Sequence, residues 1–67
     1  MLELTVNGES RTASPGTRLS ELVSELGLDG RKIAIERNLE IVPKSQYEDV
    51  SLVTGDRIEI VQFVGGG

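Results

Sequence analysis

The sequence lacks cysteine, histidine and tryptophan, and it has one tyrosine and one phenylalanine. Without cysteine there is no disulfide and no thiolate ligand for a metal. Without histidine there is no imidazole base for a Ser-His-Asp triad and no histidine metal ligand. A chain of 67 residues without these groups is a poor candidate for an enzyme that works alone. We therefore expect one small domain, with no metal or cofactor of its own, that acts through partners.

Basic residues are also scarce, with 7 Lys and Arg against 11 Asp and Glu and a formal net charge of −4. Nucleic-acid binding depends on clustered Lys and Arg, so we expect no nucleic-acid partner. The longest apolar run is Ile33-Ala34-Ile35, whereas a membrane-spanning helix needs about 20 residues. The N-terminus has no pattern of a secretory signal. We expect a cytoplasmic protein with no membrane partner. Its net negative charge would favour a partner with a basic surface.

The first part of the chain has the pattern of a β-hairpin. Residues 2–6 alternate apolar and polar side chains, as a half-buried strand does. Asn7-Gly8 follows, and this pair favours a type I′ turn because both central positions need positive φ. Residues 9–13 should then return as a short, polar edge strand.

A single amphipathic helix is predicted next, over residues 18–26. Thr17 is a suitable N-cap, and Gly27 suits the left-handed position that follows a helix. The apolar residues have the i, i+3, i+4, i+7 spacing of one helix face. They are Leu19, Leu22, Val23 and Leu26.

The second half of the chain indicates three more strands. Residues 32–37 alternate, Asn38 marks a tight turn, and residues 39–42 form a short strand before a proline. Residues 45–48 have the spacing of a capping box, which favours one helical turn. The last strand should cover residues 57–64.

This order of elements predicts an α+β fold with one helix packed across one sheet. We expect a β-grasp, or ubiquitin-like, domain with a mixed sheet of four to five strands and one crossing α-helix. Its last strand should lie parallel to its first. The domain should comprise residues 1–64, followed by a flexible glycine tail at residues 65–67.

The tail is the most unusual feature, because the chain ends in Gly65-Gly66-Gly67. Glycine has no side chain to pack and loses the most backbone freedom when it is ordered. Such a tail is either flexible padding or a segment that is threaded into a partner. In the second case Gly65 and Gly66 provide the reach, and Gly67 presents an unhindered carboxylate for activation.

The end of the last strand holds a candidate partner-binding patch. Ile58 and Ile60 should alternate toward the helix, which leaves Val61 and Phe63 on the opposite face, with Val64 next to the tail. Exposed apolar residues at this place would favour a docking surface. The alternative is a central strand with apolar residues packed on both faces.

The motifs together resemble the ThiS family of sulfur carriers in thiamine biosynthesis. The likeness covers the whole chain and is most specific in two segments. These are Asn38-Leu-Glu-Ile-Val-Pro-Lys-Ser and the ending Thr54-Gly-Asp-Arg-Ile-Glu-Ile-Val-Gln-Phe-Val-Gly-Gly-Gly. One departure is Leu39, where the family usually has glycine, and it could alter the second hairpin.

The resemblance implies a substrate protein and not a catalyst. An E1-like adenylyltransferase (ThiF-like) would use ATP and magnesium to adenylate the carboxylate of Gly67. A sulfur donor, commonly a cysteine desulfurase, would convert it to a thiocarboxylate. That group would donate sulfur to a thiazole synthase (ThiG-like) for thiazole formation. Two alternatives stay open, namely a sulfur carrier of the molybdopterin or another pathway, and a ubiquitin-like modifier or binding module.

Overall fold

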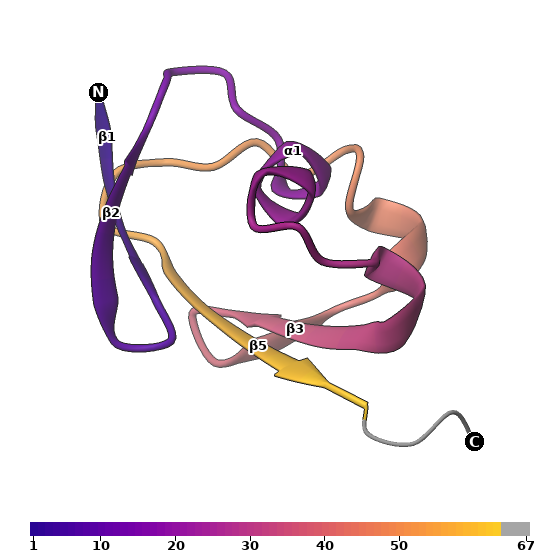
Figure 1. The fold of residues 1–67 in the computed structure, drawn as a ribbon. Coiled ribbons are helices and arrows are strands. Elements are labelled where there is room, and N and C mark those ends of the chain that lie inside the picture. Colours follow the sequence, from indigo (N-terminus) through magenta and orange to yellow (C-terminus); the bar gives the residue numbers. More distant parts are fainter. Residues whose placement is uncertain (64–67) are drawn as a thin grey trace.

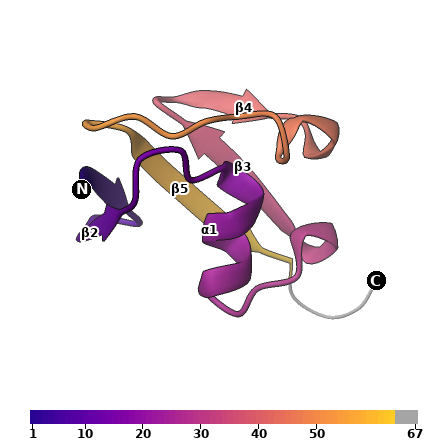
Figure 2. The same cartoon turned by 90° about the horizontal axis from the view of Figure 1, so that it is seen from above.

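In the computed structural model, which describes residues 1–63, one α-helix lies across one face of a five-stranded mixed sheet (Figures 1 and 2). The strand order is β2-β1-β5-β3-β4, with β5 parallel to β1 and antiparallel to β3. This confirms the predicted β-grasp. The elements are β1 Leu2–Val6, β2 Glu9–Ala13, α1 Leu19–Glu25, a 3₁₀ turn at Gly30–Lys32, β3 Ile33–Arg37, β4 Glu40–Val42, a second 3₁₀ turn at Lys44–Gln46, and β5 Arg57–Gln62.

The first hairpin forms as its sequence predicts. β1 and β2 pair antiparallel up to Val6 opposite Glu9, so the loop consists of Asn7 and Gly8 alone. Both residues have positive φ, 49° and 82°, as a type I′ turn requires. A two-residue sequence signal therefore sets the register of this whole hairpin.

Helix α1 is shorter than predicted, and its N-cap is Arg18 instead of Thr17. The Thr17 hydroxyl and N–H both donate to the Ser14 carbonyl, at 2.7 and 3.1 Å, so Thr17 belongs to the turn that precedes the N-cap. The Glu21 carboxylate accepts from the Arg18 backbone N–H instead, at 2.8 Å. This bond satisfies a free N–H group at the start of the helix.

The C-terminus of α1 is closed by a Schellman motif. Gly27 has a φ of 73° and its N–H donates to the Ser24 carbonyl, while the Leu28 N–H donates to the Val23 carbonyl. Both bonds satisfy carbonyls that a helix end leaves free. Leu26 lies at this end and is only half-buried, so its side chain packs against the edge of the core and not in its centre.

The second half differs from the prediction mainly at element ends. β3 starts one residue late because Asp29 caps a 3₁₀ turn that takes up Lys32. β4 starts at Glu40 because Asn38 and Leu39 form the turn before it. The predicted helical turn at 45–48 begins earlier, at Lys44, after Pro43. β5 ends at Gln62, and residue 64, the predicted end, lies outside the described residues.

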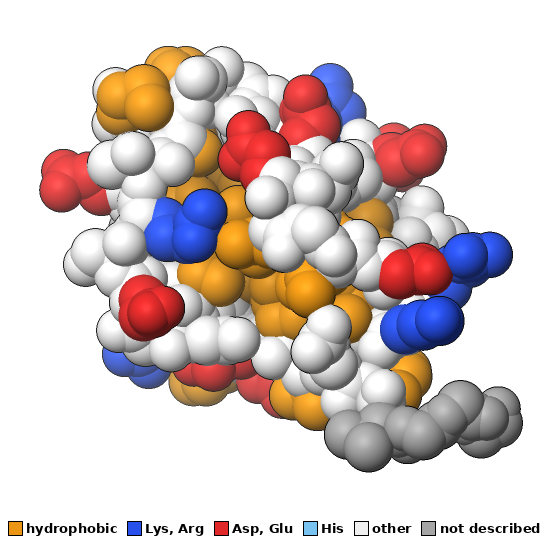
Figure 3. Space-filling model, viewed as in Figure 1, with side chains coloured by type: hydrophobic (Ala, Val, Ile, Leu, Met, Phe, Trp, Pro, Cys, Tyr) orange, Lys and Arg blue, Asp and Glu red, His pale blue; other side chains and the backbone are white. Residues whose placement is uncertain are grey.

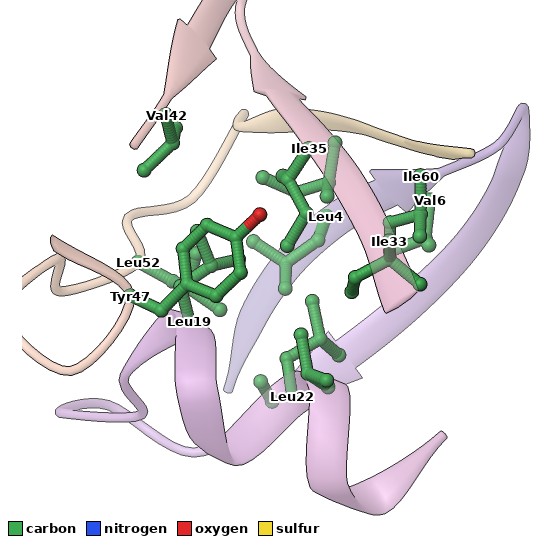
Figure 4. Packing of buried hydrophobic residues seen from close by; sticks show 13 residues of the cluster. Leu4, Val6, Leu19, Leu22, Ile33, Ile35, Val42, Tyr47, Leu52 and Ile60 are labelled. Atoms are coloured by element: carbon green, nitrogen blue, oxygen red, sulfur yellow. The ribbon is translucent and has the colours of Figure 1, made fainter. Parts of the chain in front are cut away.

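The core lies between α1 and the inner face of the sheet (Figure 4). Leu19 and Leu22 of the helix, Ile33 and Ile35 of β3, and Ile58 of β5 belong to one buried cluster. All five side chains are at most 1% exposed. Apolar burial of this kind is the main stabilising contribution to so small a domain.

Asp56 is the one buried charged side chain among the described residues, at 3% exposure. Its carboxylate accepts hydrogen bonds from the Val53 N–H at 2.9 Å, the Asn38 amide at 3.0 Å and the Arg37 guanidinium at 3.1 Å. Burial alone would raise the pKa of Asp56, but these bonds outweigh it and hold the pKa below its ordinary value of 3.8. Asp56 therefore fastens the turn before β5 to the β3–β4 hairpin.

We expect the Asp56 network to contribute to acid sensitivity. Because the pKa is lower in the folded than in the unfolded protein, the network stabilises the fold above about pH 4 and is lost as pH falls through the folded pKa. An Asp56→Asn variant should unfold more easily than wild type at pH 7, and this difference should shrink between about pH 4 and pH 2. Urea unfolding at each pH measures it, with the exposed Asp49→Asn as control. A difference that stays constant with pH would contradict the prediction.

Candidate functional site

The structure places the two described residues of the predicted patch on the surface. Val61 is 62% exposed and Phe63 is 59% exposed. Ile58 and Ile60 of the same strand are buried and point into the core between the sheet and the helix. β5 is therefore a central strand whose outer face is open, and the alternative of packing on both faces is wrong. The other predicted site residues, Val64 and Gly65–Gly67, lie outside the described residues.

Phe63 lies just after β5 and is held by contacts from the two 3₁₀ turns. Its N–H donates to the Lys32 carbonyl at 2.9 Å, which extends the β3–β5 pairing beyond the strand. The Lys44 ammonium lies 5.2 Å from the centroid of the Phe63 ring, within the range of a cation–π interaction. The same ammonium donates to the Ile33 carbonyl at 2.8 Å. The last described residue thus has a fixed backbone and an exposed ring.

Lys44 is a site residue that the sequence did not reveal. It lies 19 positions before Phe63, and no periodic pattern pairs two residues at that spacing. Only the packing of the second 3₁₀ turn against the start of β3 brings them together.

Asn7 supports β5 from the other side, in addition to its predicted place in the turn. Its side-chain carbonyl accepts from the Ile60 N–H at 2.7 Å, and its amide donates to the Ile60 carbonyl at 3.3 Å. The Asn7 N–H also donates to the Ile58 carbonyl at 2.9 Å. The side chain thereby continues the β1–β5 pairing after β1 has ended, and it orders the part of β5 that leads to the patch.

The outer face of the sheet extends the patch beyond Val61 and Phe63. Acidic and apolar side chains lie together along the lower margin of the molecule, where this face is seen from the side (Figure 3). Six residues from β3, β4, β5 and the β3–β4 turn line a shallow hollow of about 360 Å³. They are Ala34, Glu36, Leu39, Ile41, Glu59 and Val61. We call these six residues the outer-face hollow.

The sequence contained only part of the signal for this hollow. Alternation over residues 39–42 places residues 39 and 41 on a common face of a strand, but it does not say which face meets the core. In the structure Leu39 is 76% and Ile41 67% exposed, while Val42 is buried. The pairing of β3 with both β4 and β5 then brings Ile41 and Val61 onto one surface.

Asp29 at the surface and the buried Tyr47 both have a shifted pKa. Hydrogen bonds from Arg31 lower the pKa of Asp29 to about 2, and the two side chains form an ion pair at 2.9 Å. Burial raises the pKa of the Tyr47 phenol.

Within residues 1–63, no group of three or more Asp or Glu side chains is placed to hold a metal ion. No helix in the same range is long and apolar enough to cross a membrane.

Comparison with known proteins identifies relatives over nearly the whole chain. A model of the ThiS family matches residues 4–67. The sulfur carrier protein ThiS of Bacillus subtilis is 39% identical over 67 residues, which covers 100% of both chains. A thiazole synthase of Paramagnetospirillum magneticum is 53% identical over 98% of this chain, and the chain spans only 20% of that protein's length.

A solved structure gives the same result for the fold. The crystal structure of the thiamine biosynthesis protein ThiS from Geobacter metallireducens superposes with a TM-score of 0.83 at 29% identity, over 98% of this chain and 100% of that one. The family model and the full-length relative agree with it, and this chain belongs to the ThiS family.

Proposed function

We propose that this protein is a sulfur carrier whose C-terminal carboxylate, at Gly67, is converted to a thiocarboxylate for thiazole formation in thiamine biosynthesis. The observation that supports this best is the family match, which runs to Gly67 and so includes the three glycines. The full-length identity to a sulfur carrier protein supports the same role. We propose the cytoplasm, which supplies ATP, as the place of this chemistry.

The chemistry requires an activating enzyme because a carboxylate is a poor electrophile. In the proposed first step a carboxylate oxygen of Gly67 attacks the α-phosphorus of ATP in an E1-like enzyme, and pyrophosphate leaves. A persulfide sulfur, for example from a cysteine desulfurase, then attacks the acyl carbon, and AMP leaves. Reductive cleavage of the S–S bond by a thiol leaves the thiocarboxylate on Gly67. A thiazole synthase is the proposed acceptor of this sulfur.

The described part of the chain contributes recognition and position. Phe63, whose N–H is bonded to the Lys32 carbonyl, is the last residue that the structure describes, and four residues follow it in the sequence. We propose that Val61, Phe63 and Val64 form the patch that contacts the E1-like enzyme, and that Gly65 and Gly66 thread into its active site. Glycines suit this because a backbone without side chains passes through a narrow channel.

The proposed function is tested by the intact mass of the protein after incubation with ATP, magnesium, the E1-like enzyme and a sulfur donor. A gain equal to the difference between one sulfur and one oxygen atom is expected, and it should disappear without ATP. A gain of a whole target protein would instead indicate a ubiquitin-like modifier. No change of mass under complete conditions would contradict the proposal. The pathway is tested by adding a thiazole synthase and its small substrates and measuring thiazole phosphate.

A charge at Phe63 should weaken the interaction with the E1-like enzyme without damaging the tail. We expect Phe63→Glu to raise the KM for the carrier in ATP–pyrophosphate exchange by roughly tenfold or more, because the exposed ring would no longer contact the enzyme. The kcat at saturation should change little. The control is Ser24→Glu on the exposed face of α1. An unchanged KM, or a large drop in melting temperature with normal binding, would show that Phe63 is not an interface residue.

A further inference from the structure

Leu39 lies in the β3–β4 turn in a conformation that suits glycine and not leucine. Its φ is 71°, and the preceding Asn38 has a φ of 52°. A positive φ is unfavourable for a side chain such as leucine. Leu39 is also 76% exposed, so packing does not compensate for this strain. Strain that brings no stability is a feature of functional positions.

A second unfavourable feature lies next to it. Glu36 and Glu59 are directly opposite each other on β3 and β5, and like charges in such a pair destabilise a sheet. Within residues 1–63, neither carboxylate takes part in an ion pair. Ile41 lies opposite Glu36 on the other side, so the two charges are framed by apolar side chains.

We propose that the outer-face hollow is the docking site for a basic side chain, arginine or lysine, that the adenylating enzyme presents between apolar side chains of its own. This inference rests on the proposed function and adds the chemistry of the contact. A cation placed between Glu36 and Glu59 would relieve their repulsion. Leu39, Ile41 and Val61 would meet the flanking apolar groups and exclude water, which strengthens the ion pairs.

The charge of the hollow selects this occupant over a second copy of the chain. The hollow contains two carboxylates and no cation, so a symmetric dimer through it would bring four carboxylates together. The adenylating enzyme is the partner because the hollow continues along β5 toward Phe63. Four residues after Phe63 reach at most about 14 Å, so the enzyme that holds the carboxylate of Gly67 must come within that distance of Phe63, at the end of this face.

The test uses changes that should affect stability and binding in opposite directions. The double variant Glu36→Gln, Glu59→Gln removes the repulsion, and Leu39→Gly removes the strained side chain. We expect both proteins to melt at or above the wild-type temperature. Both should bind the purified E1-like enzyme about tenfold more weakly in calorimetry without ATP. The wild-type affinity should fall with rising salt, and that of the double glutamine variant should fall less.

The control is the double variant Glu9→Gln, Glu25→Gln, which removes the same charge at exposed positions on β2 and α1. Its affinity should stay within about twofold of wild type. Hollow variants that bind the E1-like enzyme with wild-type affinity and wild-type salt dependence would overturn the inference. It would also be overturned if the variants bound only the thiazole synthase more weakly, or if the wild-type protein did not bind the E1-like enzyme. Because binding is measured without catalysis, these outcomes are distinct from failure of thiocarboxylate formation.

Discussion

Deletion of Gly66 and Gly67 is expected to abolish adenylation of the protein while its melting temperature stays at the wild-type value. The carboxylate would end about 7 Å short of its normal reach, at roughly 3.5 Å per extended residue. It would then lie outside the range in which it can attack the phosphorus of ATP. The domain should not be destabilised, because all of the buried core lies within residues 4–60. ATP–pyrophosphate exchange by the E1-like enzyme and thermal melts measure the two effects.

A length-preserving variant separates reach from the need for glycine. Gly65→Ala, Gly66→Ala keeps the Gly67 carboxylate at its normal distance and adds only two methyl groups. If the tail passes through a narrow channel, this variant should also be slow, with an unchanged melting temperature. If only reach matters, it should remain active. Exchange at the wild-type rate by the truncated protein would refute the sulfur-carrier proposal.

Leu22→Ala is expected to destabilise the domain by about 2–5 kcal/mol, the cost of a large cavity in a rigid core. Leu22 is 1% exposed and faces the sheet from the middle of α1 (Figure 4). A small domain has a free energy of unfolding of about 5 kcal/mol or somewhat more, so the variant should be partly unfolded at 37 °C. Urea unfolding at 25 °C measures the change.

Two variants on the same helix serve as controls for Leu22→Ala. Ser24→Ala, at an exposed position, should change the free energy of unfolding by less than about 0.5 kcal/mol. Leu26→Ala should fall between the two, because Leu26 is only half-buried. An effect of Leu26→Ala equal to that of Leu22→Ala would contradict the position of Leu26 at the edge of the core.

Features that depend on neighbours in the chain were predictable from the sequence alone. The bounds of β1 and β2 are as predicted, because Asn7-Gly8 permits a two-residue turn and the alternation decides which face is buried. Gly27 ends the helix as expected because only a left-handed residue closes a Schellman motif. The three C-terminal glycines, on which the proposed function depends, are also read directly from the sequence.

Competition between nearby groups explains the local errors. Thr17 is a good N-cap by type, but its hydroxyl and N–H bond the Ser14 carbonyl in the preceding turn, and the N-cap is one residue later, at Arg18. Leu39 stands where the family usually has glycine, and this difference could have altered the second hairpin. The hairpin forms nonetheless, with both turn residues, Asn38 and Leu39, at positive φ. Propensity ranks the options at each position, whereas the folded chain selects one through its other contacts.

The arrangement of the candidate site was decided by tertiary structure. Asn7 and Ile60 are 53 positions apart and Lys44 and Phe63 are 19 apart, and the outer-face hollow combines three strands. Alternation shows that a strand has two faces, but the sheet order determines which side chains of different strands become neighbours. The sequence by itself determined the elements and the tail. Only packing across the sheet placed Leu39, Ile41 and Val61 around two opposed carboxylates, because contacts between distant residues have no periodic signature in the chain.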